Sequence, residues 1–311
     1  MWITIVICTW NRAPLLRGVL DSLQRADPPA ADGWDILVVD NNSSDDTADV
    51  VQNYAGRLPV SRVVETRQGL SHARNLACST ARGDYLIFTD DDVIVDQELL
   101  AEYSRAFAAH PAAAFFGGPI EPKFVAKPPR WLAANFTRFA SAYALRSGSS
   151  GLELLTDATF LPYGANMAFS RSVLRHAPFL TDLGRTGVEL IGGEETEFMG
   201  RLLASGHHGV WVGAARVQHL IAKDRMTKSY IWNYFLCQGK VQVRRHQHGL
   251  DKTSIRQAKK KVRKWRRELS LSFARDESWA NKFAWCATLA GQLQELDAHQ
   301  NDGVGARRAG A

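Results

Sequence analysis

Cysteine is scarce in this chain of 311 residues, which contains only Cys8, Cys78, Cys237 and Cys286. These four lie far apart and form no CxxC pair, which argues against a disulfide framework, a zinc knuckle or a thioredoxin-like site. No apolar run reaches the roughly 18–20 residues that span a bilayer, and no basic segment followed by a long apolar stretch predicts a secretory signal. We therefore expect a cytoplasmic protein in a reducing compartment.

The charge of the chain is unevenly distributed along the sequence. The chain carries a net charge of +6, but residues 244–267 hold eleven Lys or Arg against one acid, Asp251. That segment alone carries +10, which leaves −4 for the rest of the chain. Because no helix-turn-helix or zinc motif accompanies the segment and the remainder is acidic, we expect no nucleic-acid partner.

Apolar residues recur at helical spacing within this basic segment, namely at Ile255, Ala258, Val262, Trp265 and Leu269. They predict a helix with one narrow apolar stripe. Two interpretations stay open. The helix packs on the protein with its charges in water, or 252–273 lies on an anionic membrane, with Trp265 at the interface. The second would place the protein peripherally on the inner face of the plasma membrane.

Strand and helix patterns alternate over the first 90 residues. Apolar strands are predicted at 2–8, 35–40, 60–65 and 85–89, and helices from Pro14, at 46–55 and at 71–81. This alternation predicts an α/β fold with a mostly parallel central sheet flanked by helices. The carboxyl ends of such strands share one edge, where ligands bind, and this edge would carry Thr9, Asp40 and Asp90.

Beyond residue 110 the pattern is less regular. It predicts strands at 115–120, 161–170 and 210–217, a helix at 194–205, and helical structure from 229 onward. We expect one domain over 1–225, with a nucleotide-binding half at 1–110 and an acceptor half at 111–225. A helical basic extension would follow at 226–300, and the Gly/Ala/Arg-rich tail at 301–311 is predicted to be disordered.

Three adjacent acids, Asp90, Asp91 and Asp92, directly follow an apolar strand. They repel one another unless a cation offsets them, and Mg²⁺ or Mn²⁺ binds such carboxylates together with substrate phosphates. A solvated acidic turn is the alternative. Asp40 can accept a hydrogen bond from a nucleotide, or stabilise a turn with the asparagines behind it. Arg74 suits a diphosphate, but it also suits an ordinary surface position.

Acids also gather in the first turn of the helix predicted at 194–205, as Glu194, Glu195 and Glu197. The helix dipole favours acids there without any functional reason. Alternatively, one of them acts as a general base on an acceptor hydroxyl, its pKa raised by burial or by its acidic neighbours. His219, which follows a short strand, is either a core histidine or a metal ligand.

Taken together, eight short motifs in order resemble family 2 glycosyltransferases over residues 1–240. They are TWNR (9–12), VVDNNSSDDT (38–47), RQGLSHARN (67–75), GDYLIFTDDD (83–92), GGP (117–119), GANMAFSRS (164–172), GGEETEF (192–198) and H-x5-R-M-T-x2-Y (219–230). The resemblance implies a GT-A fold. It also implies transfer of a sugar, with inversion, from a nucleotide-diphosphate sugar to an acceptor hydroxyl. The product would be a polysaccharide, a lipid-linked glycan or another cell-envelope glycan.

The resemblance also implies roles for individual residues. The donor-binding residues would be Thr9, Asn11, Arg12, Asp40, Arg74, Asp90 on the ribose, and Asp91. Asp92 would hold Mn²⁺ or Mg²⁺, with His219 as a further ligand. The family carries Glu-Asp at the helix start, where this chain has Glu194-Glu195. Glu195 is the predicted base and Glu194 the second choice.

Two other functions remain open. A nucleotidyltransferase would share the α/β layout and the acidic site, although TWNRAP lacks the glycine-rich loop that such enzymes usually carry after the first strand. The second alternative is a catalytically inactive relative that only binds sugar nucleotides.

The distribution of acids along the chain fits glycosyl transfer. Single-displacement chemistry needs one carboxylate near the acceptor, apart from the metal-binding acids, and the chain distributes its acids in this way.

Overall fold

The computed structural model describes residues 1–175, 178–187, 189–246, 252–272 and 274–309. It divides into two compact units. The first, here called the sheet unit, comprises 1–124, 143–187 and 193–221. The second, the helical unit, comprises 125–142, the segment around 188–192 and everything from 222 onward.

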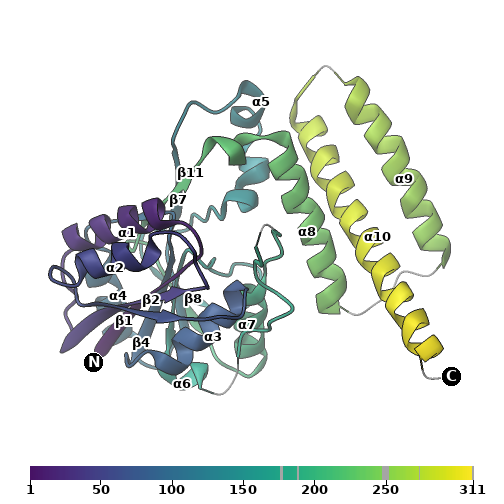
Figure 1. Ribbon diagram of the computed structural model, residues 1–311. Coiled ribbons are helices and arrows are strands. Elements are labelled where there is room, and N and C mark those ends of the chain that lie inside the picture. Colours follow the sequence, from purple (N-terminus) through teal and green to yellow (C-terminus); the bar gives the residue numbers. More distant parts are fainter. Residues whose placement is uncertain (176–177, 188, 247–251, 273, 310–311) are drawn as a thin grey trace. The chain divides into compact units, whose positions relative to one another are not determined.

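An eight-stranded, mostly parallel sheet forms the centre of the sheet unit (Figure 1), in the order β3-β2-β1-β4-β9-β6-β10-β8. The strands are β1 (Trp2–Thr9), β2 (Gly33–Asp40), β3 (Val60–Val64), β4 (Tyr85–Asp90), β6 (Phe115–Gly117), β8 (Leu152–Leu155), β9 (Asn166–Ser170) and β10 (Gly209–Val212). Strands β1 to β4 pair in parallel, whereas β9 runs antiparallel to β4 and β6. The predicted central sheet is therefore confirmed.

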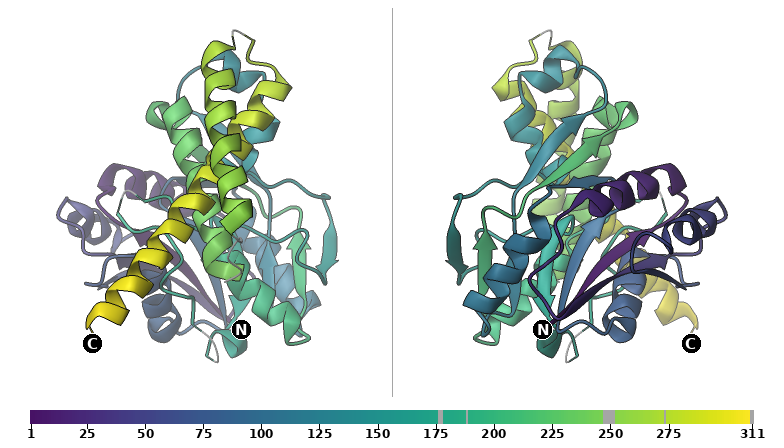
Figure 2. Two further views of the ribbon diagram at one scale, coloured as in Figure 1. Left: turned by 90° about the vertical axis from the view of Figure 1, so that its right-hand side faces the viewer. Right: turned by 90° about the vertical axis from the view of Figure 1, so that its left-hand side faces the viewer.

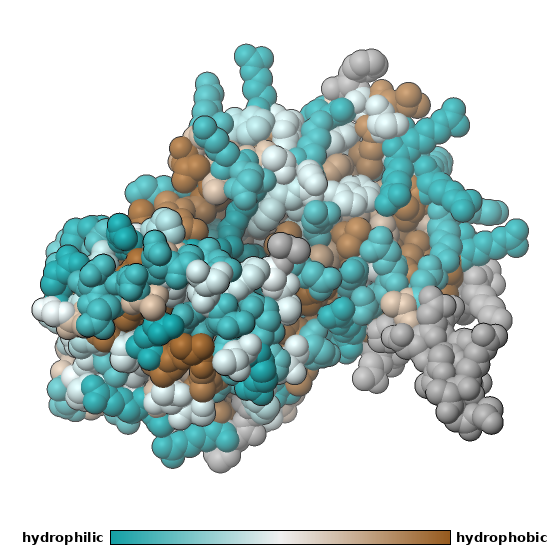
Figure 3. Space-filling model, viewed as in Figure 1, coloured by the Kyte–Doolittle hydropathy of each residue, from teal (hydrophilic) through white to brown (hydrophobic). Residues whose placement is uncertain are grey.

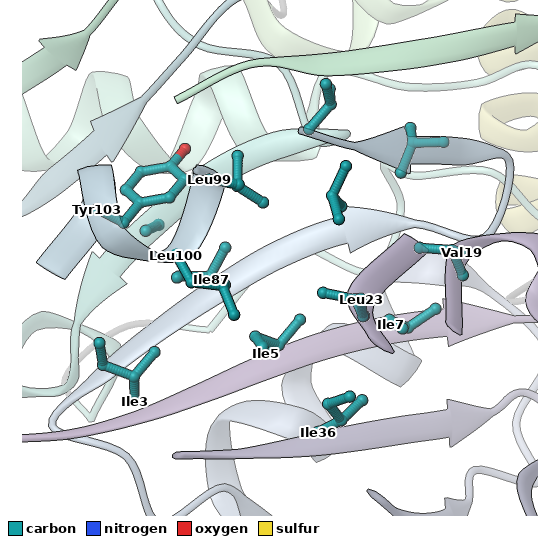
Figure 4. Packing of buried hydrophobic residues seen from close by; sticks show 14 of the residues in the cluster. Ile3, Ile5, Ile7, Val19, Leu23, Ile36, Ile87, Leu99, Leu100 and Tyr103 are labelled. Atoms are coloured by element: carbon teal, nitrogen blue, oxygen red, sulfur yellow. The ribbon is translucent and has the colours of Figure 1, made fainter. Parts of the chain in front are cut away.

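Helices cover both faces of this sheet because its strands are apolar on both sides. One face packs against α1 (Ala13–Arg25), α2 (Thr47–Tyr54) and α4 (Leu99–Ala109). The other packs against α3 (Leu70–Thr80), α6 (Arg171–Leu174) and α7 (Glu194–Ala204). Along β1, Ile3, Ile5 and Ile7 belong to the hydrophobic cluster on the first face and Val6 to the cluster on the second. Figure 4 shows the three isoleucines among the residues of the first cluster.

A second, three-stranded sheet lies beside the acidic strand end. Its order is β5 (Val93–Val95), β11 (Val217–Ile221) and β7 (Ile120–Phe124). In the antiparallel β5–β11 pair, His219 stands opposite Val93, the residue directly after the three acids. The sequence predicted one strand over 210–217, but the structure has two, β10 and β11, which belong to different sheets.

The helical unit is built on three long helices, α8 (Lys228–His246), α9 (Lys252–Leu271) and α10 (Glu277–Ala309). It also holds α5 (Arg130–Ala133), most of the 3₁₀ helix η1 (Phe136–Tyr143), and η2 (Lys223–Met226). Figure 2 shows α10 lying alongside both α8 and α9. The α8–α10 crossing is close, because a Cβ atom on Gly239 would collide with the backbone of Thr288, and one on Gly291 with that of Leu236.

The apolar stripe of α9 packs inward against α10. Ala258 and Val262 are buried and form a cluster with Cys286, Ala290 and Leu293. Ile255, Trp265 and Leu269 are partly buried against the same cluster. Several basic residues of α9, among them Lys260, Arg263 and Arg267, are exposed, and Figure 3 shows long hydrophilic side chains projecting from this part of the molecule.

Two further findings concern the end of α10 and the apolar length of the described helices. Helix α10 continues to Ala309, so it extends into the stretch 301–311 for which the sequence predicts disorder, and residues 310–311 lie outside the described residues. Among the residues described, no helix is long and apolar enough to cross a membrane.

Candidate active site

The carboxyl ends of β1 and β4 bring the TWNR motif against the three acids, because Cys8 pairs with Asp90. The Thr9 hydroxyl donates to Asp91 Oδ2 at 2.7 Å, and Arg12 Nη1 donates to Asp91 Oδ1 at 2.9 Å. Burial raises the pKa of Asp91 to about 6, although Arg12 opposes that rise. Arg12 also contacts Asp92 Oδ2 at 3.3 Å, so this arginine is the cation that offsets the acidic cluster.

Asp92 faces His219 across the β5–β11 pair, with 3.3 Å between Asp92 Oδ1 and His219 Nε2. The other ring nitrogen, Nδ1, lies 2.6 Å from the carbonyl oxygen of Tyr143. Only a protonated Nδ1 can donate to that carbonyl, which in a neutral imidazole leaves a lone pair on Nε2 directed at the carboxylate.

This donor set fits a divalent metal ion. An imidazole nitrogen and a carboxylate oxygen suit Mn²⁺, and Mg²⁺ also binds through one or two carboxylates while keeping positions for substrate phosphates. No group of three or more His, Cys, Asp or Glu side chains that could hold a metal occurs among the described residues.

Asp40, at the end of β2, occupies a separate network. Its Oδ1 accepts from the Ser43 amide at 2.8 Å, and its Oδ2 accepts from Arg62 Nε at 2.9 Å. Asn11 adopts a positive φ of 52° and accepts from the Ser44 amide at 2.7 Å, which ties the TWNR loop to this turn. The sequence did not single out Arg62, and its position on the neighbouring strand β3 is the signal that would have found it.

Asn41 connects β2 to the start of α3, a second role that sequence reasoning missed. Its side chain accepts from the Gly69 amide at 2.8 Å and donates to the Arg67 carbonyl at 2.7 Å. Gly69 has φ of 138°, a conformation that favours glycine. The first turn of α3 is thereby anchored to the edge of the sheet, and α3 carries Arg74.

Arg74 points into the protein rather than toward solvent. It is only 3% exposed, and its guanidinium forms an ion pair with Glu194 at the start of α7. Its Nη2 lies 4.0 Å from Asp90 Oδ1. Gly164 makes room for this arrangement, because a Cβ atom there would collide with the guanidinium. The structure thus joins Arg74, Asp90 and Glu194, which lie on three different elements.

Glu195, the residue after Glu194, does not take part in the ion pair with Arg74. Burial, followed by the charge of Glu194, raises the pKa of Glu195 to about 7. Its buried Oε2 has no hydrogen-bond partner within the described part of the chain. A carboxyl group with a pKa near neutrality is suited to accept a proton at physiological pH.

The parallel sheet with its acidic edge defines a protein of the GT-A class, and solved structures agree. A mannosyltransferase from Pyrobaculum calidifontis, in complex with GDP-Man and Mn²⁺, aligns over 99% of this chain and 80% of its own with a TM-score of 0.54 at 20% identity. Staphylococcus aureus TarS 1–349 with UDP-GlcNAc aligns over 97% of this chain and 92% of its own, with a TM-score of 0.51 at 14% identity.

The chain belongs to glycosyl transferase family 2, whose family model matches residues 4–177, more than half of its length. The predicted family is therefore confirmed. S. aureus TarS, a poly(ribitol-phosphate) β-N-acetylglucosaminyltransferase, is 28% identical over 35% of this chain, a match that spans 19% of TarS. A glucosyl-dolichyl phosphate glucuronosyltransferase from Haloferax volcanii is 24% identical over 72% of this chain and 71% of its own.

Proposed function

We propose that this chain is an inverting glycosyltransferase that moves a sugar from a nucleotide-diphosphate sugar to an acceptor hydroxyl. Glu195 takes the proton of the acceptor hydroxyl while its oxygen attacks the anomeric carbon, and the nucleoside diphosphate leaves from the opposite face. Family membership favours this reaction over the nucleotidyl transfer that the sequence left open. The product would belong to polysaccharide, lipid-linked or other cell-envelope glycans.

Asp92 and His219 are the residues proposed to hold Mn²⁺ or Mg²⁺. When bound, the metal would neutralise negative charge on the leaving diphosphate. Arg12 and Thr9 hold Asp91, and so keep the acidic strand end in place beside the donor. Asp90, whose side chain is 36% exposed, is free to reach the ribose, and Asp40 and Asn11 shape the loop around the base.

The observation that carries the proposal is the contrast between Glu194 and Glu195. Glu194 forms a buried ion pair with Arg74, whereas Glu195 lies outside that pair and has a pKa raised to about 7; each of the two glutamates has one buried oxygen without a hydrogen-bond partner in the described structure. The contrast supports Glu195 as the base and assigns Glu194 and Arg74 to positioning. Arg74, predicted from the sequence to bind the donor, is instead proposed to hold the base helix.

The test uses a panel of UDP-, GDP- and dTDP-sugars with Mn²⁺ or Mg²⁺, and follows nucleoside diphosphate release. Glu195→Gln should lower turnover at least ~10²-fold, the usual scale for a general base, with donor affinity nearly unchanged. Wild-type turnover should rise with pH through about 7, because the base must be ionised. If Glu194→Gln proves far worse than Glu195→Gln, the assignment of the base is wrong. An inactive relative would bind donors without releasing nucleoside diphosphate.

An anionic membrane surface is proposed as a partner of the basic helix α9. The apolar stripe of α9 packs on α10, so insertion of Trp265 into a bilayer would require the two helices to separate. The exposed lysines and arginines remain available to an anionic membrane surface through charge alone. This supports a peripheral enzyme held near an acceptor at the inner face of the plasma membrane.

A further inference from the structure

One end of the helical unit gathers two cations and two indole rings. Lys228 is the first residue of α8, and Arg275 lies two residues before α10. The Lys228 ammonium is 5.5 Å from the ring centre of Trp279 and 5.9 Å from that of Trp131 in α5. The Arg275 guanidinium lies 4.9 Å from Trp279. Figures 1 and 2 show α5 beside the first turns of α8 and α10.

These two cations lack an acidic partner. Within the part of the chain that the structure describes, neither has a carboxylate oxygen within 4.0 Å. The nearby acid Asp276 is engaged as a cap, since its Oδ1 accepts from the Trp279 amide at 2.9 Å. Partial burial and then the charge of Arg275 lower the pKa of Lys228. Arg275 Nη1 donates to the backbone carbonyls of Ser272 and Ala274, which are neutral acceptors and do not offset its charge. Two cations without a carboxylate partner gain stability when an anion binds near both of them.

The surrounding groups add to the positive potential. The first turn of α8 contains no acid, so its N-terminal dipole is not offset there, whereas α10 has Glu277 in its first turn. The indole Nε1 of Trp279 is buried without a hydrogen-bond partner in the described structure, and the residue is 5% exposed. A buried donor without an acceptor is costly, and a ligand oxygen would relieve that cost.

We propose that Lys228 and Arg275, with the indole rings of Trp131 and Trp279, form an anion site that binds a phosphate group of the acceptor. The cations provide charge-assisted hydrogen bonds to phosphate oxygens, and the rings fix the positions of both cations. The identification of the ligand as the acceptor rests on the proposed glycosyl transfer. The binding of phosphate does not, so the two can fail separately.

The test measures phosphate binding without a donor sugar. Calorimetry with glycerol 1-phosphate, in chelator and with the Asp92→Ala variant, keeps the proposed metal site from contributing. We expect the Lys228→Gln/Arg275→Gln variant to bind at least ~10-fold more weakly, the scale of losing one or two charge-assisted hydrogen bonds. Lys260→Gln/Arg263→Gln on α9 removes the same charge from exposed positions and should bind glycerol 1-phosphate like the parent. A second arm uses phosphatidylcholine vesicles containing phosphatidic acid, and compares Lys228→Gln/Arg275→Gln with its parent in a chain that carries Lys260→Gln/Arg263→Gln/Arg267→Gln, so that attraction of α9 to the vesicles is reduced in both.

Each outcome decides the inference. Binding of glycerol phosphate that depends on Lys228 and Arg275 identifies a soluble phosphate ester as the ligand. The same dependence with vesicles alone identifies a lipid phosphate, and the anion site stands in both cases. No phosphate binding by the parent in either arm, or equal loss of glycerol 1-phosphate binding in the α9 control, overturns it. Thermal melting of the double variant shows whether lost binding reflects lost folding.

Discussion

At the scale of single residues, Glu195 links protonation to stability. Its pKa in the folded protein is about 7, against an ordinary value of 4.5. The folded state therefore binds this proton more tightly than the unfolded state does. The stabilisation is complete below about pH 4.5 and is lost as pH rises through about 7.

A neutral replacement should remove this pH dependence. Glu195→Gln is expected to melt at the same temperature as the wild type at pH 5, where Glu195 is mostly protonated. At pH 8 the variant should melt at a higher temperature, because it no longer holds a desolvated carboxylate beside Glu194. Differential scanning calorimetry at the two pH values measures the contrast. If the variant and the wild type melt at equal temperatures at both pH 5 and pH 8, the buried carboxylate of Glu195 does not destabilise the fold.

Asp92 offers a second test at this scale. Asp92→Ala should abolish the Mn²⁺-dependent rise in melting temperature that a nucleotide-sugar donor produces, since binding to the folded state raises that temperature. The fold should survive, because Arg12 keeps its 2.9 Å contact with Asp91. Asp49→Ala, at an exposed position on α2, is the matched control. A Mn²⁺-dependent shift that persists in Asp92→Ala would exclude Asp92 as the ligand.

The sequence located much of the candidate site, and its limits have physical causes. Thr9, Asp40 and Asp90 were found because parallel strands end at one edge. The proximity of Asp92 and His219 depends on β5, a strand of three residues that is too short to show a pattern. The Arg74–Glu194 ion pair joins positions 120 residues apart, and no local periodicity encodes it.

At the scale of elements, the α8–α10 crossing depends on two glycines. Gly291→Ala should destabilise the protein by about 1–3 kcal/mol, the usual cost of overpacking, because the added methyl group collides with the Leu236 backbone. Gly18→Ala is the control, since nothing lies within 4 Å of the added carbon in α1. Alanine favours a helix, so the control should melt at an equal or higher temperature. Equal melting of both variants would contradict the close crossing.

For the apolar stripe of α9, the sequence could predict the helix but not the surface that covers it. The spacing of Ile255, Ala258 and Val262 correctly predicted an amphipathic helix, and the structure has α9 over Lys252–Leu271. Periodicity cannot identify what covers an apolar stripe, because another helix and a membrane are equally apolar partners. Here α10 covers it, so deleting α9 would expose Cys286, Ala290 and Leu293 and would not be a clean test of membrane binding.

At the scale of the whole molecule, charge separation is the dominant feature, with +10 in 244–267 and −4 elsewhere. The mildly acidic remainder should be repelled by an anionic membrane while the basic segment is attracted, which would favour one orientation at the surface. Each exposed lysine or arginine near the surface contributes about 1 kcal/mol at low salt. Lys260, Arg263 and Arg267 are exposed on α9 and lie outside the apolar cluster that it forms with α10, so they can be changed without uncovering the stripe.

We therefore expect the protein to co-sediment with phosphatidylglycerol vesicles but not with phosphatidylcholine vesicles at low salt, and to be released by added salt. Lys260→Gln/Arg263→Gln/Arg267→Gln should reduce this recovery strongly and leave nucleoside diphosphate release with a water-soluble acceptor unchanged. Because α10 covers the apolar stripe of α9, only charge should hold the protein on the vesicles, and salt alone should reverse the binding completely. Retention at high salt would instead show that α9 leaves α10 and inserts its stripe. Equal recovery with neutral and anionic vesicles, or none with either, would mean that the charges of α9 serve only to keep it in water.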